Sequence, residues 1–235
     1  VVGVAACVAV FALNTQPSSQ TLFGSTADDV EYYKYVQKYG KSYGTKEEFR
    51  FRQEKFAAAS ESINSHNAQN GVSFHLAANK FADWTPEEYK RLLGYKSVQV
   101  NGDVTLTATN ATRPAAIDWR TLGAVNAVKD QGQCGSCWAF SGIGALESAH
   151  AIKTGNLISL SEQQIVDCAT GGQFYSQGCN GGYMYEVFQY AEKVPVELES
   201  AYPYKAVDGT CKAKGGNVED SSYANVQVNS RAAFL

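Results

Sequence analysis

The cysteines of this 235-residue chain constrain its fold more than any other feature. Cys7 stands alone near the start, whereas the other five lie at positions 134, 137, 168, 179 and 211. In an oxidising compartment cysteines pair, and each disulfide holds two distant segments together. If Cys7 is removed with a leader, five cysteines remain, and an odd number leaves one thiol unpaired. We therefore expect a disulfide-linked second half that carries a free thiol.

The N-terminal run VVGVAACVAVFAL is apolar over thirteen residues, whereas a helix that spans a bilayer needs roughly 20. Such a run followed by polar NTQPSSQ is typical of a secretory signal, although a buried helix or strand is the alternative. Residues 1–20 are therefore expected to be the remnant of a signal peptide. No Met and no basic leader precede the run, so the natural start is expected upstream.

Composition and charge exclude some classes of function. The chain is 44% hydrophobic and 18% charged, which is typical of a globular protein. Its formal net charge of −3 gives no bulk basicity. We therefore expect neither nucleic-acid binding nor stable association with an anionic membrane.

The first half has helical patterns. Helices are predicted from residue 28 to Gly40 and from Thr45 to the turn at residues 70–71, with Thr45 and Glu48 forming a capping box. Residues spaced by three or four form one stripe on the second helix. An ordinary amphipathic helix is the alternative to a special role for this stripe, which comprises Glu48, Arg52, Phe56, Ala59, Ile63 and Asn67.

A less regular region follows. Alternation in VSFHLAANKFAD, residues 72–83, predicts a strand with a turn, and Thr85 followed by Pro86 predicts a short helix. Residues 96–112 lack helical periodicity and are expected to form an exposed connection, with a domain boundary near Arg113. Within this connection Asn110 begins a glycosylation acceptor, N-A-T.

The second half begins its regular structure at Cys137. A long apolar helix is predicted from there to Gly155, and Ser161 with Gln164 predicts the start of the next helix. One face of the long helix is expected to hold Trp138, Gly142, Ala145, Ala149 and Ile152.

The segment QGQCGSCWAFS, residues 131–141, allows three interpretations. A redox couple of Cys134 and Cys137 would follow a strand in a βαβ unit, but a polar loop precedes it here. A zinc site would need Cys168 and Cys179 as further ligands, and their spacing is unlike that of zinc motifs. The third interpretation is one structural cysteine beside one nucleophile.

The nucleophile interpretation has a physical basis. Cys137 stands where a loop enters a helix, and the helix dipole there favours the thiolate, which attacks carbonyl carbons. The resulting oxyanion needs hydrogen-bond donors, and the Gln131 side-chain amide with the Cys137 N–H could supply them. Gly132 and Gly135 would let the backbone approach a substrate, although both could be ordinary turn residues.

These motifs resemble those of a known family. QGQCGSCWAF is similar to the nucleophile segment of the papain and cathepsin cysteine proteases, and AIDWR, GCNGGY and YPY, at residues 116–120, 178–183 and 202–204, resemble further family motifs in the same order. The first half resembles the family's inhibitory propeptide. Its E-R-F-N-I-N pattern is matched by Glu48, Arg52, Phe56, Ile63 and Asn67, with Ala59 in place of the first Asn, and its G-N-F-D pattern by Asn79, Phe81 and Asp83, with Ala77 in place of Gly.

The resemblance implies an α+β, papain-like fold. Residues 26–95 would form a helical propeptide domain, and residues 96–112 an exposed linker with the activation cleavage region. Residues 113–235 would form the mostly helical first half of a two-domain protease whose β-rich second half is missing. The implied function is that of a cysteine endopeptidase precursor that its own propeptide inhibits. The alternatives are a propeptide-like inhibitor and an inactive homologue.

The resemblance also implies residue roles. Cys137 would be the nucleophile and Gln131 would contribute to the oxyanion hole. The implied disulfides are Cys134–Cys179 and Cys168–Cys211, which leave Cys137 as the free thiol. The implied protein is a monomer without cofactor or metal, located in a lysosome, an acidic vacuole or outside the cell.

Substrate binding would use residues on two loops. Gly135, Gly181 and Gly182 would contact an extended peptide backbone. Tyr183 and Met184 would line the pocket for the residue two before the cleaved bond, which predicts a preference for bulky apolar side chains there.

The catalytic base is the component that the sequence does not supply. The family's His and Asn follow the nucleophile by about 130 to 150 residues, which places them beyond about residue 265. The three histidines of this chain are His66, His75 and His150, and all are expected to be structural or on the surface. We therefore expect an incomplete precursor that does not hydrolyse peptides by itself.

Overall fold

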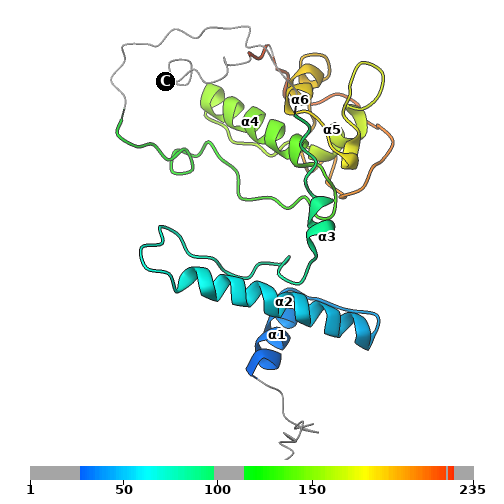
Figure 1. Ribbon diagram of the computed structural model, residues 1–235. Coiled ribbons are helices and arrows are strands. Elements are labelled where there is room, and N and C mark those ends of the chain that lie inside the picture. Colours follow the sequence, from blue (N-terminus) through cyan, green and yellow to red (C-terminus); the bar gives the residue numbers. More distant parts are fainter. Residues whose placement is uncertain (1–26, 98–113, 221, 225–235) are drawn as a thin grey trace, which may run out of the picture. The chain divides into compact units, whose positions relative to one another are not determined.

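The computed structural model describes residues 27–97, 114–220 and 222–224. The chain forms two compact units that divide between Trp84 and Thr85 (Figure 1). The expected signal segment and Asn110 lie outside the described residues. Within the described ranges, no helix combines the length and the apolarity needed to cross a membrane.

The first unit is built on helices α1, Ala27–Lys38, and α2, Lys46–Asn67. Its core is aromatic, with Tyr32, Tyr35 and Phe56 buried between the helices. The rings of Tyr35 and Phe56 have their centroids 4.6 Å apart. Such large rings bury much apolar surface, which is how a pair of helices can form a stable core.

The start of α2 differs in detail from the expected capping box. The Thr45 hydroxyl accepts a hydrogen bond from the Glu48 N–H, as expected. The Glu48 carboxylate, however, accepts from the Gly44 N–H at 3.4 Å, one residue before the expected partner. Its other oxygen lies 3.6 Å from the Arg52 guanidinium, so the Glu48 side chain is shared between the cap and an ion pair.

The strand expected in residues 72–83 is absent from the described structure, which has an irregular segment there. The Asn67 carboxamide explains the difference. Its nitrogen donates to the Leu76 carbonyl and its oxygen accepts from the Leu76 N–H, both at 2.8 Å. One side chain therefore takes both backbone bonds that a neighbouring strand would have made.

Asp83 is the polar centre of the first unit. Its side chain is 1% exposed and accepts hydrogen bonds from the Tyr35 hydroxyl at 2.8 Å, from the Lys41 ammonium at 2.9 Å and from the Tyr43 hydroxyl. Burial alone would raise the pKa of Asp83, but the bonds from Tyr43, Lys41 and Tyr35 outweigh it and hold the pKa below the ordinary value of 3.8. The Arg52 guanidinium donates to the Asp83 carbonyl at 3.2 Å and ties α2 to the same point.

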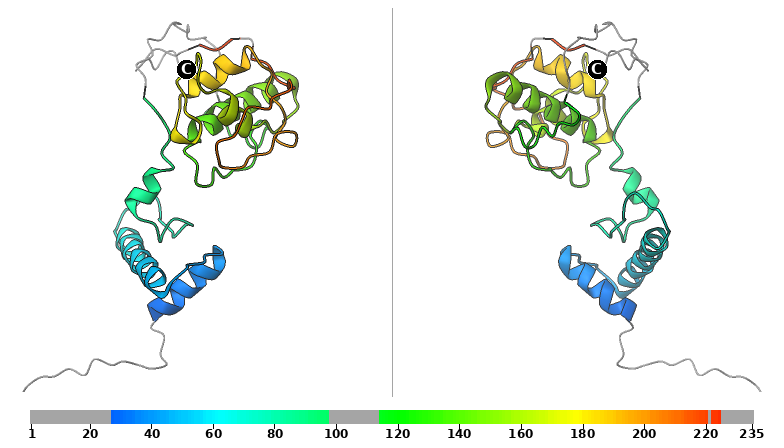
Figure 2. Two further views of the ribbon diagram at one scale, coloured as in Figure 1. Left: turned by 90° about the vertical axis from the view of Figure 1, so that its right-hand side faces the viewer. Right: turned by 90° about the vertical axis from the view of Figure 1, so that its left-hand side faces the viewer.

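The second unit contains the remaining helices, and α4 packs against α5 and α6 (Figure 2). They are α3, Pro86–Lys90; α4, Cys137–Thr154; α5, Glu162–Cys168; the short 3₁₀ helix η1, Gly178–Asn180; and α6, Met184–Ala191. The expected caps of α3 at Thr85 and of α5 at Ser161 are present, and Gly155 ends α4 in the left-handed conformation at φ 74°. Strand pairing in the described part of the chain is limited to isolated bridges.

The buried face of α4 agrees only in part with the expected one. Trp138 and Gly142 are buried, but Ala145, Ala149 and Ile152 face solvent. Ile143 and Leu146 fill the rest of the core. Two stripes of this apolar helix have helical spacing, and Glu147 makes the true core stripe look polar in the sequence. In the structure Glu147 is buried because a lysine pairs with it.

Residues 85–95 were expected to complete the first domain and residues 96–97 to begin the linker, but both group with the second unit. Their backbone explains this grouping. The Gly182 N–H donates to the Gly94 carbonyl at 2.8 Å, and the Lys96 N–H donates to the Gly182 carbonyl at 3.1 Å. The segment after α3 is therefore hydrogen-bonded to the loop before α6.

The Asp83 cluster predicts how acid affects the first unit. A carboxylate whose pKa is lowered by folding stabilises the fold above its unfolded pKa, and this stability is lost as the pH falls through the folded value. Asp83→Asn should destabilise the first unit by about 3 kcal/mol at pH 7, because Lys41 loses a buried partner. It should also flatten the loss of stability below about pH 4. Hydrogen exchange of α1 and α2 peptides in urea measures both effects.

Asp118→Asn is the matched control, because Asp118 forms an ion pair with Arg120 at an exposed site in the second unit. It should leave α1 and α2 unchanged. Equal acid sensitivity in wild type and Asp83→Asn would contradict the role of Asp83.

Candidate active site

Cys137 is the first residue of α4 and is half-buried. The expected disulfides Cys134–Cys179 and Cys168–Cys211 are both formed, and among the described cysteines only Cys137 is free. The Cys134–Cys137 redox couple and the zinc site are therefore excluded, because Cys134, Cys168 and Cys179 each hold another sulfur. The remaining interpretation is a free thiol at a helix start.

The loop before Cys137 is fixed against the loop before α6. The Gly135 N–H donates to the Cys179 carbonyl at 2.9 Å, beside the disulfide between Cys134 and Cys179. A Cβ atom at Gly135 would lie 2.5 Å from that carbonyl oxygen, so the contact requires glycine. The Trp138 indole, buried at the start of α4, donates to the Gly178 carbonyl at 3.1 Å and makes a second link.

The Gln131 side chain points its amide at backbone carbonyls. Its nitrogen donates to the Cys134 carbonyl at 2.8 Å and to the Leu92 carbonyl at 3.0 Å. The first bond fixes the amide within its own loop. The second shows that this amide binds a peptide carbonyl from another segment, as a donor to an oxyanion must.

Residues 92–96 lie beside this loop, and glycines on both sides allow the backbones to come close. Tyr95 pairs with Gly182 in a parallel bridge. A Cβ at Gly94 would lie 1.7 Å from the Gly135 carbonyl oxygen, and one at Gly181 would lie 2.5 Å from the Gly94 carbonyl oxygen. The backbone of this segment therefore approaches both loops more closely than any side chain would allow.

An apolar cavity of about 400 Å³ adjoins the segment. It lies between α4 and α6, and its lining includes Tyr95, Gly142, Tyr183, Met184, Tyr185 and Phe188. Tyr183 and Met184 were the residues expected to line a side-chain pocket. The structure places both on this cavity and places Tyr95 of the neighbouring segment there too.

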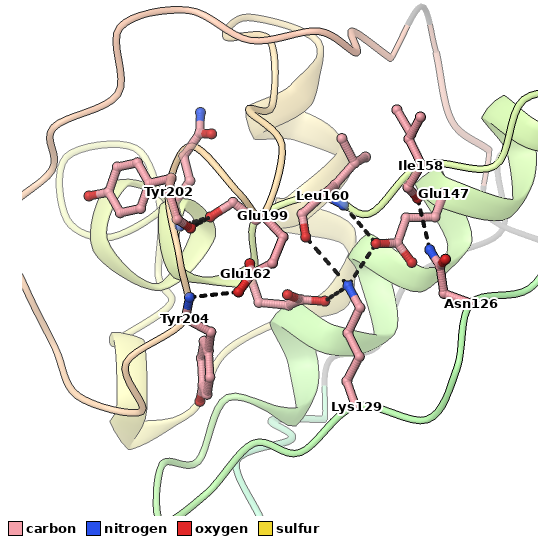
Figure 3. Close-up of polar contacts among 11 residues, drawn as sticks. Asn126, Lys129, Glu147, Ile158, Leu160, Glu162, Glu199, Tyr202 and Tyr204 are labelled. Carbon is pink, nitrogen blue, oxygen red and sulfur yellow. Dashed lines mark hydrogen bonds and ion pairs between the residues drawn. The ribbon is translucent and has the colours of Figure 1, made fainter.

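A buried ion cluster supports α4 from the other side (Figure 3). The Lys129 ammonium lies 2.7 Å from the Glu147 carboxylate and 2.5 Å from the Glu162 carboxylate. The same Glu147 oxygen accepts from the Leu160 N–H at 2.8 Å. The cluster thus joins the segment before Gln131 to α4 and α5.

The cluster has two carboxylates for one ammonium, and this shifts its proton affinities. Burial by itself would lower the pKa of Lys129, but Glu147 and Glu162 outweigh it and raise that pKa above 10.5. Burial raises the pKa of Glu162 to about 7, because Lys129 compensates only part of the lost hydration. Glu162 therefore binds a proton far more readily than an exposed glutamate.

The structure brings most expected site residues together. Cys137, Gln131, Gly135, Gly181 and Gly182 lie on two loops joined by one disulfide. The propeptide motif residues lie in the first unit, where Glu48, Arg52, Phe56 and Asp83 form the contacts described above, Asn67 binds Leu76, Asn79 accepts from the Phe81 N–H at 2.9 Å, and Ile63 is half-buried.

Sequence reasoning missed three groups: the segment 92–96, the Lys129 cluster, and the Tyr204 hydroxyl. Gly94, beside two leucines, was a signal for the first, since an isolated glycine marks close backbone approach. Nothing in the sequence around Lys129 predicted that this lysine would pair with Glu147 and Glu162, because both lie in later helices.

The histidines do not supply a base to Cys137 within the second unit. His150 lies thirteen residues along α4, which is about 20 Å at 1.5 Å per residue. His66 stacks on Phe74, with ring centroids 4.6 Å apart, and one of its ring nitrogens lies 3.2 Å from the Phe74 carbonyl oxygen. His75 is an exposed residue of the first unit.

Comparisons with known proteins agree with this geometry. Residues 113–234 match the papain family cysteine protease domain, and residues 32–89 match the cathepsin propeptide inhibitor domain, I29. Digestive cysteine proteinase 1 of Homarus americanus is 42% identical over 222 residues, which are 91% of this chain and 69% of that protein. Cathepsin L1 of Drosophila melanogaster is 40% identical over 203 residues, which are 80% of this chain and 54% of that protein.

A solved structure is similar in fold as well. Digestive procathepsin L2 proteinase from Tenebrio molitor larval midgut superposes with a TM-score of 0.74 at 35% identity, over 82% of this chain and 65% of that chain. The chain thus spans between about half and about two thirds of these proteins.

Gly94 tests whether segment 92–96 shields the thiol. Gly94→Ala should displace the segment, because its Cβ would overlap the Gly135 carbonyl, and alkylation of Cys137 by iodoacetamide should accelerate at least fivefold. Peptide mass spectrometry over time measures the rate. Gly44→Ala is the control, since a Cβ there meets nothing within 4 Å. Equal rates in all three proteins would show that the segment does not shield Cys137.

Glu162 predicts a pH dependence opposite to that of Asp83. A carboxyl whose pKa is raised by folding stabilises the fold fully below its unfolded pKa, and this stability is lost as the pH rises through the folded value. The second unit should therefore lose stability between pH 4.5 and about 7. Glu162→Gln should flatten this loss, whereas Glu192→Gln, at an exposed site, should not. Hydrogen exchange of α5 peptides in urea decides, and an unchanged slope in Glu162→Gln would refute the assignment.

Proposed function

This chain belongs to the papain family of cysteine proteases, and from that premise we propose that it carries the nucleophile-bearing part of an autoinhibited endopeptidase. The proposed protein acts in the secretory pathway, in a lysosome-like compartment or outside the cell. One observation carries the proposal. The only free thiol among the described cysteines stands at the start of α4, on the loop whose Gln131 amide already binds a peptide carbonyl.

The proposed chemistry begins at Cys137. Its sulfur attacks the carbonyl carbon of a peptide bond, an S–C bond forms, and the carbonyl π electrons move to the oxygen. The Gln131 amide and the Cys137 N–H stabilise this oxyanion. When the oxyanion collapses, the C–N bond breaks and the amine leaves with a proton, which gives a thioester. Water then hydrolyses the thioester and restores the thiol.

The leaving amine needs a proton donor, normally an imidazole. We propose that polypeptide outside the described residues supplies it, since His150 is too far along α4. The second unit also exposes a set of apolar side chains that a further domain could cover. They are Ile117, Trp119, Leu122, Val125 and Val128.

Autoinhibition follows from the position of residues 92–96. The Leu92 carbonyl takes the Gln131 amide, and Gly94 and Lys96 take the N–H and C=O of Gly182. These are the groups that would bind the backbone of a substrate. We propose that the segment competes with substrate until the propeptide is removed, and that the cavity beside Met184 then accepts a bulky apolar side chain.

Protonation of Asp83 in acid would loosen the first unit, but only over a narrow pH range. Because the pKa of Asp83 lies below 3.8, Asp83 remains charged at about pH 5. We therefore propose that mild acid leaves the first unit folded, and that Asp83 contributes to release only below about pH 4.

Two alternatives have less support. An inhibitor made of residues 26–95 alone would not need the free thiol of Cys137 or the Gln131 amide, which lie in the rest of the chain. An inactive homologue would not need a free thiol with an amide donor on the same loop.

A peptidyl chloromethyl ketone tests the proposed nucleophile. The chain should be alkylated at Cys137, because displacement of chloride by sulfur needs no proton donor. The same chain should not turn over a peptide amide, because that step does need one. Mass spectrometry locates the adduct, and Cys137→Ser should abolish it. Labelling elsewhere or no labelling would refute Cys137 as the nucleophile. Amide turnover that Cys137→Ser removes would instead show that the chain contains its own base.

A further inference from the structure

The Tyr204 hydroxyl joins the two ends of the loop that precedes the nucleophile. It lies 2.9 Å from the Gln131 carbonyl oxygen and 2.5 Å from the Ser136 hydroxyl. A carbonyl can only accept, so the single phenolic proton is donated to Gln131. The Ser136 hydroxyl must therefore donate its own proton to Tyr204. The direction of both bonds is fixed by this chemistry.

Ser136 consequently does not act as an ordinary helix cap. It precedes α4 at the N-cap position, where serine usually accepts an N–H bond from the first turn. Its side chain makes no such bond. Among the helices that the structure describes, Thr45, Thr85 and Ser161 do make it, with ψ angles of 163°, 159° and 112°. Ser136 has a ψ of 13°, about 100° or more from these values.

This angle matters because it sets the direction of the Cys137 N–H. Rotation about ψ of Ser136 turns the peptide plane between Ser136 and Cys137 as a rigid unit. A Ser136 in the capping conformation would therefore point the Cys137 N–H differently. The same hydroxyl that removes Ser136 from the cap also anchors the backbone of Gln131, the other expected oxyanion donor.

Tyr204 is itself held firmly. Its N–H donates to the Glu199 carboxylate at 2.8 Å (Figure 3), and its ring packs edge-on against Phe140 of α4, with centroids 4.8 Å apart. Burial raises the pKa of the phenol above 10, with a smaller opposing effect from Ser136, so the group remains a donor at physiological pH. It can therefore act as a fixed point for the loop.

We propose that Tyr204 is a positioning residue of the oxyanion site. Its hydroxyl withholds Ser136 from capping α4 and so aims the Cys137 N–H, while it holds Gln131 in place from the other side. The inference rests on the proposed function, in which these two groups stabilise the oxyanion.

The test compares two probes of Cys137 in the Gly94→Ala background, so that residues 92–96 compete weakly in every variant. A peptide aldehyde forms a hemithioacetal: an S–C bond forms, the C=O π bond breaks, and the oxygen takes up the thiol proton. The oxyanion donors bind this tetrahedral oxygen. Iodoacetamide alkylates the same sulfur by displacing iodide and needs no such donors. Tyr204→Phe keeps the ring on Phe140. It should weaken aldehyde binding about tenfold or more and change the alkylation rate less than about twofold.

A second substitution separates positioning from a structural effect. Ser136→Ala cannot cap α4, so in the double variant with Tyr204→Phe no hydroxyl competes for the first turn. The double variant should therefore recover most of the lost aldehyde affinity, whereas Ser136→Ala alone should change it less than about threefold. Tyr202→Phe is the matched control, because the Tyr202 hydroxyl binds Asp167 rather than the loop. It should leave both probes unchanged.

Several outcomes would overturn the proposal. Unchanged aldehyde affinity in Tyr204→Phe would show that the hydroxyl does not position the site. A loss that Ser136→Ala deepens, or that appears equally with iodoacetamide, would show a merely structural role. Formation of the Cys134–Cys179 disulfide, followed by mass spectrometry, confirms folding of each variant. If neither probe reacts at Cys137 in the parent protein, the proposed function itself fails, and the result is distinct from the others.

Discussion

The pairing of the Cys134 loop with the Cys179 loop is the constraint on which the candidate site depends. One disulfide and the bond from the Gly135 N–H to the Cys179 carbonyl hold the two loops together. One loop carries the Cys137 thiol and the Gln131 amide, and the other carries the Gly182 backbone. The Cys179 loop contains only the short helix η1, and residues 131–136 of the Cys134 loop form no helix or strand. The disulfide and the hydrogen bonds between the loops therefore hold the donors for a carbonyl and the donors for an extended backbone in one arrangement.

The ion pairs of Lys129 make the stability of the second unit depend on pH. Lys129 lies two residues before Gln131 and forms ion pairs with Glu147 of α4 and Glu162 of α5. These pairs anchor the loop to both helices. Burial raises the pKa of Glu162 to about 7, because Lys129 offsets only part of the lost hydration. In the first unit Asp83 has three donors and a lowered pKa. The two units therefore respond to acid in opposite directions: protonation favours the unit with the thiol and opposes the unit that precedes it.

Local chemistry made part of this predictable. The starts of α2, α3 and α5 follow from Thr45, Thr85 and Ser161, because a hydroxyl at an N-cap acts on backbone only three residues away. The lone thiol followed from the odd number of cysteines that remain when Cys7 is set aside. Features set by distant partners were not predictable: Asn67 replaced a strand, and Lys129 turned Glu147 into a core residue. Ser136 has the residue type and place of a helix cap, and only Tyr204, 68 residues later, shows why it does not cap. The prediction of a strand in residues 72–83 was wrong for the same physical reason. The Asn67 side chain bonds the N–H and C=O of Leu76, which the sequence pattern assigned to strand pairing.

Under the proposed function, the glycines explain why segment 92–96 and a substrate would compete for one surface. Gly94 approaches Gly135 so closely that a Cβ would overlap its carbonyl, and Gly181 meets the Gly94 carbonyl from the other side. Contacts of this kind are made with the peptide group and not with the side chain, so any extended peptide can form them. Such a surface is suitable for a protease that cuts many sequences, but it cannot by itself distinguish substrate from propeptide. Discrimination must then come from side chains beside the backbone, and the apolar cavity between α4 and α6 is the adjoining feature that offers it. Tyr95 lines that cavity, so segment 92–96 would, under the proposed function, place a side chain where a substrate places one.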